Sequence, residues 1–93
     1  MKLWPVGLYR VAGESMRPTY APGDVLVGLR WFRARTGQVV VAHHERPLIK
    51  RIKSVSGRNI WLVGDNPAAS TDSRQFGPVV RHQLEAKIIG KLS

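Results

Sequence analysis

The sequence predicts an all-β domain, a small barrel or sandwich built from short antiparallel strands. Clusters of Gly, Pro, Asp and Asn that favour turns recur at short intervals, and the runs between them are rich in β-branched and other apolar residues. This pattern is typical of β-barrels and sandwiches rather than of helical domains. With 93 residues, 43% of them hydrophobic, the chain has material for one core and not for two. We therefore expect one domain over residues 1–93.

The runs between the turns are the expected strands. They cover residues 8–11, 25–29, 38–42, 48–55, 59–63 and 87–92. The turns fall at residues 21–24, 36–37, 45–47, 56–58, 64–67 and 77–78. A short helical turn is expected over residues 80–86, after Pro78. Residues 64–78 are too long for a hairpin turn, and a loop of that length in a small domain is usually functional.

The expected interior comes from the apolar positions of these strands. The residues expected in the core or along the walls of a cleft are Val11, Val25, Val27, Val41, Leu48 and Ile52. Trp31, Phe32 and Trp61 also lie in strand-like runs, which favours core or groove-wall positions for their rings.

Composition excludes several classes of protein. The chain has no cysteine, so disulfides and thiolate metal sites are excluded. Apolar stretches such as residues 39–42 are far too short to span a bilayer, and Pro5 and Gly7 interrupt the N-terminal run as they would not in a signal peptide. The chain is therefore expected to be soluble. The apolar side chains available for peripheral contact with a membrane or a partner are Leu3, Trp4, Val6 and Leu8.

The net charge is +9, from 15 basic and 6 acidic residues. Such a charge favours acidic partners, anionic lipid surfaces or nucleic acid through long-range attraction. The basic residues are scattered, however, with no block of five like charges. Nucleic-acid sites combine a basic patch with aromatic stacking faces, so the scatter indicates a solvated basic surface, and no nucleic-acid partner is expected.

Residues 13–19, which read GESMRPT, set one serine on a corner of the chain. Ser15 lies between Gly13 and a Pro-Thr turn, directly after an apolar strand-like run. A serine on such a corner can point its hydroxyl into a cleft, as a nucleophile must. Serines in turns are common for ordinary backbone reasons, so this segment indicates catalysis only together with a partner elsewhere.

A candidate partner is the lysine of the run LIKRIK, residues 48–53. The two-residue period of a strand places Leu48, Lys50 and Ile52 on one apolar face and leaves the other face solvated. Desolvation lowers the pKa of a lysine in apolar surroundings, so its neutral amine can act as a general base. The alternative is a lysine whose stem packs on the sheet while its ammonium stays in water.

The loop of residues 64–77 is dense in small polar side chains. Asp72 and Arg74 can pair to hold the loop closed. A hydroxyl in this loop can bond the lysine amine and aim it at the serine, and the candidates are Ser70, Thr71 and Ser73. A plain turn-rich surface loop is the alternative.

Together these segments resemble the bacterial type I signal peptidases, a family of Ser–Lys endopeptidases. The matching segments follow the family's order: a nucleophile box at residues 13–19, a Gly-Asp strand at residues 22–27, a lysine box at residues 48–52, and a last box made of residues 64–66, Ser70, residues 72–74 and Gly77. The resemblance covers most of the chain, from about residue 11 to residue 79.

The resemblance implies a serine endopeptidase with a Ser–Lys dyad that needs no cofactor or metal. Ser15 would attack the scissile carbonyl, and neutral Lys50 would take its proton and later pass it to the leaving amine. Ser70 would orient the amine. Asp72 and Arg74 would support the loop rather than take part in the chemistry.

The oxyanion hole is expected at Ser15 and Gly13. The backbone N–H of Ser15 would be one donor. Many relatives carry a hydroxyl donor two positions before the nucleophile, where this chain has Gly13, so the hole would rely on backbone donors or water. The membrane anchor of larger relatives is not seen in residues 1–9, and residues 53–63 leave no room for their inserted second β-domain.

The resemblance also implies a precursor protein as substrate, bound as an extended strand along an exposed edge. This pared-down form is similar to the maturation proteases proposed for nickel-type superoxide dismutase, which would remove a short leader from a cytoplasmic precursor. A cytoplasmic location is then expected, and nickel would belong to the substrate. The alternative is a signal peptidase acting on exported preproteins, which is membrane-associated if the chain is a fragment of an anchored enzyme.

Other classes of protein remain as alternatives. A self-cleaving repressor domain uses a similar Ser–Lys pair, but no helix-turn-helix is apparent in the sequence. A basic β-barrel that binds nucleic acid has no reason to place Ser15 beside Lys50. No metal site is expected, because His43 and His44 are adjacent on a strand and point to opposite faces, with His82 distant in sequence.

Overall fold

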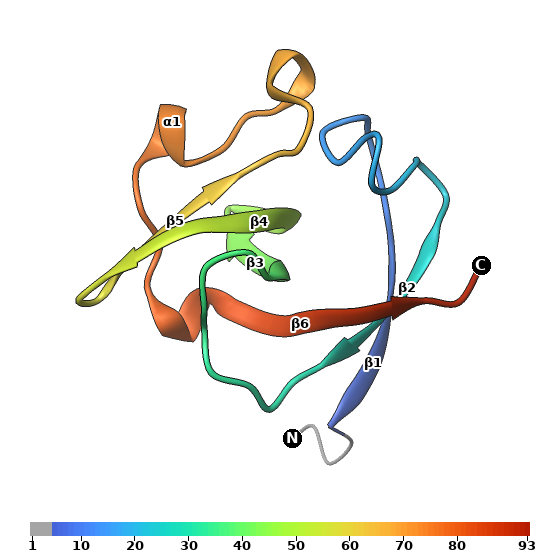
Figure 1. The fold of residues 1–93 in the computed structure, drawn as a ribbon, viewed down its shortest axis with the longest axis horizontal. Coiled ribbons are helices and arrows are strands. Elements are labelled where there is room, and N and C mark those ends of the chain that lie inside the picture. The colour runs from blue at the N-terminus through green and yellow to red at the C-terminus, as the bar shows by residue number, and fades with distance from the viewer. Residues whose placement is uncertain (1–4) are drawn as a thin grey trace.

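The computed structural model describes residues 5–93, which form one six-stranded antiparallel sheet with little helix (Figure 1). The strands are β1 (Val6–Arg10), β2 (Val25–Leu29), β3 (Val39–His44), β4 (Arg46–Ser56), β5 (Asn59–Val63) and β6 (Leu84–Lys91). They lie in the order β1-β2-β6-β3-β4-β5, and every neighbouring pair is antiparallel. The all-β prediction is confirmed.

Three short helical turns lie between β5 and β6: η1 (Pro67–Ala69), α1 (Ser73–Phe76) and η2 (Arg81–Gln83). The first two occupy the long loop that the sequence indicated. The helical turn expected over residues 80–86 is wrong in its second half, because β6 begins at Leu84. Leu84 and Ala86 pair with β3 and are buried, so the sheet contacts override the local tendency to form a helical turn.

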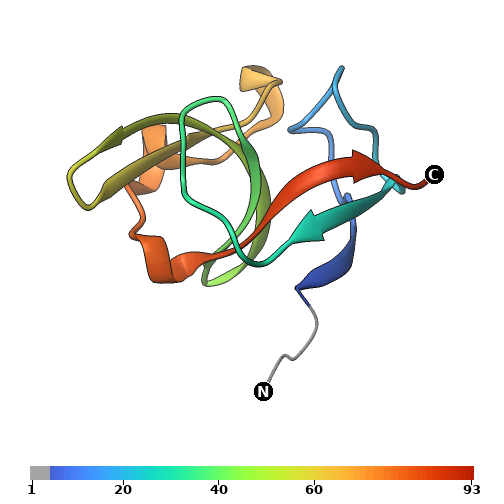
Figure 2. The ribbon, with the colours of Figure 1, turned by 60° about the horizontal axis from the view of Figure 1, so that its bottom comes forward.

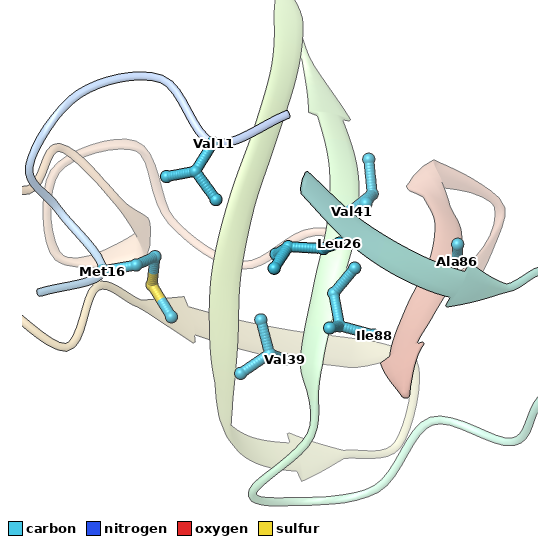
Figure 3. Packing of buried hydrophobic residues seen from close by; sticks show 7 residues of the cluster. All are labelled: Val11, Met16, Leu26, Val39, Val41, Ala86 and Ile88. Atoms are coloured by element: carbon cyan, nitrogen blue, oxygen red, sulfur yellow. The ribbon is translucent and has the colours of Figure 1, made fainter. Parts of the chain in front are cut away.

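The central strand β3 is buried on both faces and separates two hydrophobic clusters. The first cluster, whose side chains converge in Figure 3, consists of Val11, Met16, Leu26, Val39, Val41, Ala86 and Ile88. The second cluster consists of Val40, Ala42, Ile52, Ile60, Leu62, Val79 and Leu84. Because both faces of β3 pack in the interior, its VVVA run is continuously apolar instead of alternating with polar residues.

Because of an irregularity in its pairing with β3, strand β6 contributes side chains to both hydrophobic clusters. Leu84 packs in the second cluster and Ala86 and Ile88 in the first, although a regular strand would place all three on one face. The register with β3 shifts between Val41 and Ala42. Such a β-bulge adds one residue to a strand, bends it and changes the facing of the side chains beyond it.

In strand β2, the side chains that point into the core are not the ones that were expected. Leu26 is fully buried in the first cluster, whereas Val25 and Val27 are half-buried and belong to neither cluster. The prediction of Val25 and Val27 as core or cleft-wall residues is therefore wrong, since neither lines a cleft in the described part of the chain either. Apolar side chains occupy both faces of this strand and do not reveal which face turns inward. The other expected residues have core or wall positions: Val11, Val41 and Ile52 are buried, and the half-buried Leu48 lines a cleft.

The aromatic residues are divided between the core and the surface. Phe32 packs against the second cluster, and Trp61 is partly exposed on β5. Trp31 is 68% exposed and lies outside the strands, so the expectation of a core or wall position is wrong for this residue. Trp4 lies outside the described residues.

Two loops distant in sequence lie side by side at one end of the sheet (Figures 1 and 2). One loop, residues 11–24, connects β1 with β2, and the other, residues 64–77, follows β5. They are joined by a hydrogen bond of 2.8 Å from the Asn66 backbone N–H to the Ser15 carbonyl oxygen. The fold thus brings the serine segment to the polar loop.

Candidate active site

A cleft of about 510 Å³ contains the predicted serine and lysine. Its lining comes mainly from two segments, residues 8–16 of β1 and the loop after it, and residues 46–50 of β4. β3 pairs with one edge of β4 over residues 46–51, whereas β5 pairs with the other edge only over residues 51–56. Among the strands of residues 5–93, none covers that second edge at residues 46–50, so this edge is open beside the cleft.

Ser15 is held by buried neighbours on both sides. Val11 before it and Met16 after it belong to the first hydrophobic cluster. Between them, Gly13 has a φ of 78°, a left-handed conformation that glycine adopts without strain, and this reverses the chain. Ser15 is half-buried and lines the cleft. The corner predicted from the sequence is therefore fixed by packing on both sides.

Lys50 is 4% exposed, and its Nζ lies 2.9 Å from the Oγ of Ser15. The amine donates a hydrogen bond to the hydroxyl in this geometry. The alternation predicted for the strand holds around the lysine, since Lys50 and Ile52 are buried. The opposite face is less solvated than expected, because Ile49 packs against the first cluster and Arg51 is half-buried.

Burial is the main influence on the protonation of Lys50. It lowers the pKa of the ammonium below its usual range, because the charged form loses its hydration. The positive charges of Arg46 and Arg74 lower the pKa further, and the negative charge of Asp72 acts in the opposite direction. The net shift favours a neutral amine, the form that can accept a proton from a serine hydroxyl.

Asp72 is fully buried and organises the polar loop. Its carboxylate accepts hydrogen bonds from Ser70 Oγ at 2.6 Å, from the Gly64 backbone N–H at 2.8 Å, and from two nitrogens of the Arg74 guanidinium at 2.9 Å. Burial alone would raise the pKa of Asp72, but these hydrogen bonds, led by those from Arg74, outweigh it and hold the pKa well below its usual range. The expected pairing of Asp72 with Arg74 is present.

The three candidate hydroxyls have different partners. Ser70 donates to Asp72, and Ser73 Oγ accepts a hydrogen bond from the Leu62 backbone N–H. Thr71 lines the cleft. Among the hydrogen bonds of residues 5–93, the one made by the Lys50 amine goes to Ser15, and the expected bond with Ser70 is not found. The single hydroxyl proton of Ser70 is donated to the carboxylate of Asp72.

Gly64 contributes by its lack of a side chain. A β-carbon at this position would lie 2.6 Å from the Cβ of Ser70 and 2.7 Å from the backbone oxygen of Ser15. Its φ is not in the left-handed region, so close packing, and not backbone conformation, requires glycine here. The sequence indicated Gly64 as part of a turn and as the first residue of the last box. It did not indicate the close packing that requires a glycine here.

The loops around the dyad are also joined by Asp65. Its carboxylate accepts two hydrogen bonds of 2.8 Å from the Arg51 guanidinium and one from the Thr19 hydroxyl. Asp65 thus links β4, next to Lys50, to the loop that carries Ser15. Asn66 adds a bond from its side-chain amide to the Glu14 carbonyl oxygen at 3.1 Å. The sequence indicated Asp65 and Asn66 as turn formers and as part of the last box, but not their partners, which are distant in sequence.

The expected oxyanion hole involves the backbone N–H groups of Ser15 and Gly13. No hydrogen bond within residues 5–93 uses the N–H of Ser15 or of Gly13. An ideal β-carbon on Gly13 would meet no atom within 4 Å, so the space beside it is open. Both N–H groups are thus free of protein acceptors in the described part of the chain.

The histidines make local contacts. His43 Nε2 lies 2.7 Å from a carboxylate oxygen of Glu85, and the ring of His44 stacks on Phe76 with centroids 4.0 Å apart. Within residues 5–93 there is no cluster of three or more His, Asp or Glu side chains able to hold a metal ion.

The site thus combines a buried lysine of β4 with a cleft serine from the loop that follows β1. The chain belongs to the Peptidase S24-like family, because a model of that family matches residues 5–93. Together with the relatives described next, this match confirms the resemblance to peptidases of the signal-peptidase type.

Two curated proteins are similar in sequence to this chain. The chain is 30% identical over 105 residues to the mitochondrial inner membrane protease subunit 1 of Xenopus tropicalis, over 83% of this chain and 63% of that protein. It is 47% identical over 34 residues to the subunit of the same name from Schizosaccharomyces pombe, over 37% of this chain and 22% of that protein. The chain therefore matches less than two thirds of either relative's length. No helix within residues 5–93 is long and apolar enough to cross a membrane.

Proposed function

We propose that this protein is a serine endopeptidase that uses a Ser15–Lys50 dyad to remove an N-terminal leader from a precursor protein. The observation that carries the proposal is the 2.9 Å contact between Ser15 Oγ and the Nζ of a lysine that is almost fully buried. A non-enzymatic basic barrel has no use for this contact, because burying a lysine costs free energy. Membership of a peptidase family supports the same function.

In the first half of the proposed reaction, Ser15 Oγ attacks the scissile carbonyl carbon of the precursor. The hydroxyl proton passes to the lone pair of neutral Lys50 Nζ as the new C–O bond forms. The carbonyl oxygen becomes an oxyanion, and the free N–H groups of Ser15 and Gly13 are its candidate donors. One such donor is worth about 3 kcal/mol of transition-state stabilisation in comparable sites.

In the second half, the C–N bond breaks and the Lys50 ammonium gives its proton to the leaving amine. The leader is then bound to Ser15 as an ester. Water attacks this ester while Lys50 accepts one of the water protons, and the proton returns to Ser15 Oγ as the leader is released. Lys50 is thus base and acid in turn, a role that requires a pKa below that of an ordinary lysine.

The open edge of β4 supports binding of the substrate as an extended strand. Residues 46–50 line the cleft and have no neighbour on that edge among the described strands. A peptide that pairs with this edge would receive backbone hydrogen bonds for affinity, and its alternate side chains would enter the cleft for selectivity. Such a strand would run past the hydroxyl of Ser15.

Two classes of precursor are candidates. One is the leader of a nickel-type superoxide dismutase, with nickel as cargo of the substrate, which the resemblance to the maturation proteases of that enzyme implies. The names of the two relatives favour a precursor processed at a membrane, because both are inner membrane protease subunits.

Intact-mass spectrometry of both precursors after incubation with the protein tests the proposal. One precursor is a nickel superoxide dismutase with its leader, and the other is an exported preprotein in detergent. Ser15→Ala is the inactive variant, and Ser56→Ala, at an exposed serine of the β4–β5 hairpin, is the matched control.

The expected result is a single cut at the leader junction that the Ser56→Ala protein retains and the Ser15→Ala protein loses. A cut in the first precursor identifies a maturation protease, and a cut only in the second identifies a peptidase of membrane-associated precursors. A cut that persists in Ser15→Ala, or no cut in either precursor, contradicts the proposal.

A further inference from the structure

Two arginines line the cleft beside the dyad. Arg46 opens β4 and Arg10 closes β1, and both strand ends border the same cleft. Both side chains are exposed. Neither takes part in the chemistry proposed above, and neither was singled out by the sequence motifs.

The place of Arg46 on the strand relates it to the dyad. Arg46, Leu48 and Lys50 alternate along β4, so their side chains lie on one face, and all three line the cleft. Four residues of extended strand put the Arg46 backbone about 13 Å from that of Lys50. The electrostatic influence of Arg46 on the Lys50 amine is consistent with this placement.

The charges in the cleft are not balanced by the protein itself. Neither Arg10 nor Arg46 is in an ion pair or a side-chain hydrogen bond with any residue of 5–93. Glu14 is the one acidic residue of the lining, and it is paired with Arg17. By contrast, Arg51 and Arg74 are neutralised by Asp65 and Asp72. The cleft therefore presents two uncompensated guanidinium groups to whatever enters it.

We propose that Arg46, with Arg10 as a second cation, selects leaders that carry an acidic side chain about four residues from the scissile bond. This inference rests on the proposed function. A substrate strand on the open edge of β4 would place one of its side chains opposite Arg46, at the distance of about 5 Å typical of cross-strand pairs. A guanidinium binds a carboxylate through two parallel hydrogen bonds and discriminates against an amide or an ammonium at that position.

The test measures both binding and cleavage. The probes are alanine-rich peptides of about twelve residues, long enough to span the cleft when extended. Each carries one Asp, one Asn or one Lys, placed at each position in turn. Binding is measured by fluorescence anisotropy on protein that carries Ser15→Ala, and kcat/KM is measured on protein with Ser15 intact. Both measurements are made with Arg46 unchanged, with Arg46→Glu and with the control Arg58→Glu. Arg58 is exposed in the β4–β5 hairpin and does not line the cleft.

The expected result is a preference of about tenfold for Asp over Asn at one position, in both affinity and kcat/KM. In Arg46→Glu the preference reverses toward Lys at that same position, and in Arg58→Glu it is unchanged. Any change in Lys50 basicity caused by the loss of Arg46 affects all peptides alike, so it cancels when peptides are compared on one variant.

Binding separates this inference from the proposed function. Equal affinity and equal cleavage for Asp, Asn and Lys peptides overturn the inference while leaving the peptidase intact. A preference for Asp that survives Arg46→Glu also overturns it. Acid-selective binding that depends on Arg46, without cleavage of any peptide or precursor, supports the inference and contradicts the peptidase proposal.

Discussion

Two neighbouring basic residues of β4, Lys50 and Arg51, meet opposite surroundings. Lys50 points to the buried face and contacts Ser15, and burial lowers its pKa. Arg51 points to the other face, where hydrogen bonds from its guanidinium to Asp65 raise its pKa. In the same strand, Lys50 thus tends to lose its proton, whereas the adjacent Arg51 keeps its proton.

The difference shows that the environment of each face, and not the residue type alone, decides the role of a basic side chain. The Lys50 face supplies a base at the cost of burying an amine. The Arg51 face supplies an ion pair that links β4 to the loops around the serine. The first arrangement serves chemistry, and the second holds its geometry.

The largest effect is expected when the Lys50 amine, which can be neutral, is replaced by a permanently charged group. Lys50→Arg keeps a long basic side chain but removes the proton acceptor, because arginine stays protonated in proteins. We expect leader cleavage to fall by about a thousandfold or more in single-turnover assays. Lys53→Arg, on the exposed side of the same strand, is the control and is expected to retain full activity. Substantial activity in Lys50→Arg would exclude Lys50 as the base.

A smaller loss is expected when the packing between the two loops is disturbed. Gly64→Ala introduces a β-carbon within 2.7 Å of the Ser15 backbone oxygen and displaces Ser70. We expect a loss of about 1–3 kcal/mol in the free energy of unfolding, typical of overpacking, and a decrease in kcat of about tenfold or more, since small displacements of reacting groups slow reactions strongly. Gly90→Ala, where a β-carbon would meet open space, is the control. Equal behaviour of the two variants would show that the contact is relaxed easily.

The Arg51 face is tested through its acidic partner. Asp65→Asn leaves the Arg51 guanidinium without its charged acceptor and weakens the bond to Thr19. We expect the free energy of unfolding to decrease by about 1–2 kcal/mol in urea titrations. Activity should fall less than in Lys50→Arg, because the dyad itself is intact. Glu45→Gln, at an exposed turn, is the control. An unchanged unfolding midpoint would mean that this ion pair adds no net stability.

The Lys50 face is tested through the pH dependence of stability. Because the folded pKa of Lys50 is lowered, the unfolded state holds a proton there that the folded state lacks. Stability therefore falls as the pH decreases from the usual lysine pKa to the folded pKa, and is level below that. Lys50→Met removes this loss, so we expect it to be about 1 kcal/mol more stable than wild type near neutral pH. The difference should shrink toward about pH 10. A pH-independent difference would mean that Lys50 stays charged when folded.

The smallest effect is expected at Ser70. Ser70→Ala removes one of several hydrogen bonds to Asp72, and Arg74 and the Gly64 N–H remain. We expect kcat to fall by several-fold to about tenfold, in line with the loss of about 1 kcal/mol for a single hydrogen bond. A loss as large as that of Lys50→Arg would instead indicate that Ser70 contacts the amine during the reaction.

Sequence patterns alone located most of the elements of the fold. Turn chemistry and β-branched runs are local properties, so they placed β2 and β5 at their observed bounds and located the other strands to within a few residues. The two-residue period of a strand also predicted that Lys50 lies on the buried face of β4. It failed on β2, where both faces are apolar, and at residues 84–86, where pairing with β3 and burial decide the structure.

What the sequence determined by itself is the set of parts: a serine on a glycine corner, a lysine on an apolar strand face and a polar loop, each encoded by adjacent residues. Tertiary structure decided which atoms meet. The contact of Ser15 with Lys50 spans 35 residues, and the bond of Asp65 to Thr19 spans 46. The choice of Asp72 as partner of Ser70, and the need for glycine at position 64, follow from loops packed together by the sheet. Such contacts depend on the register and packing of segments distant in sequence, which local periodicity and turn propensity do not reveal.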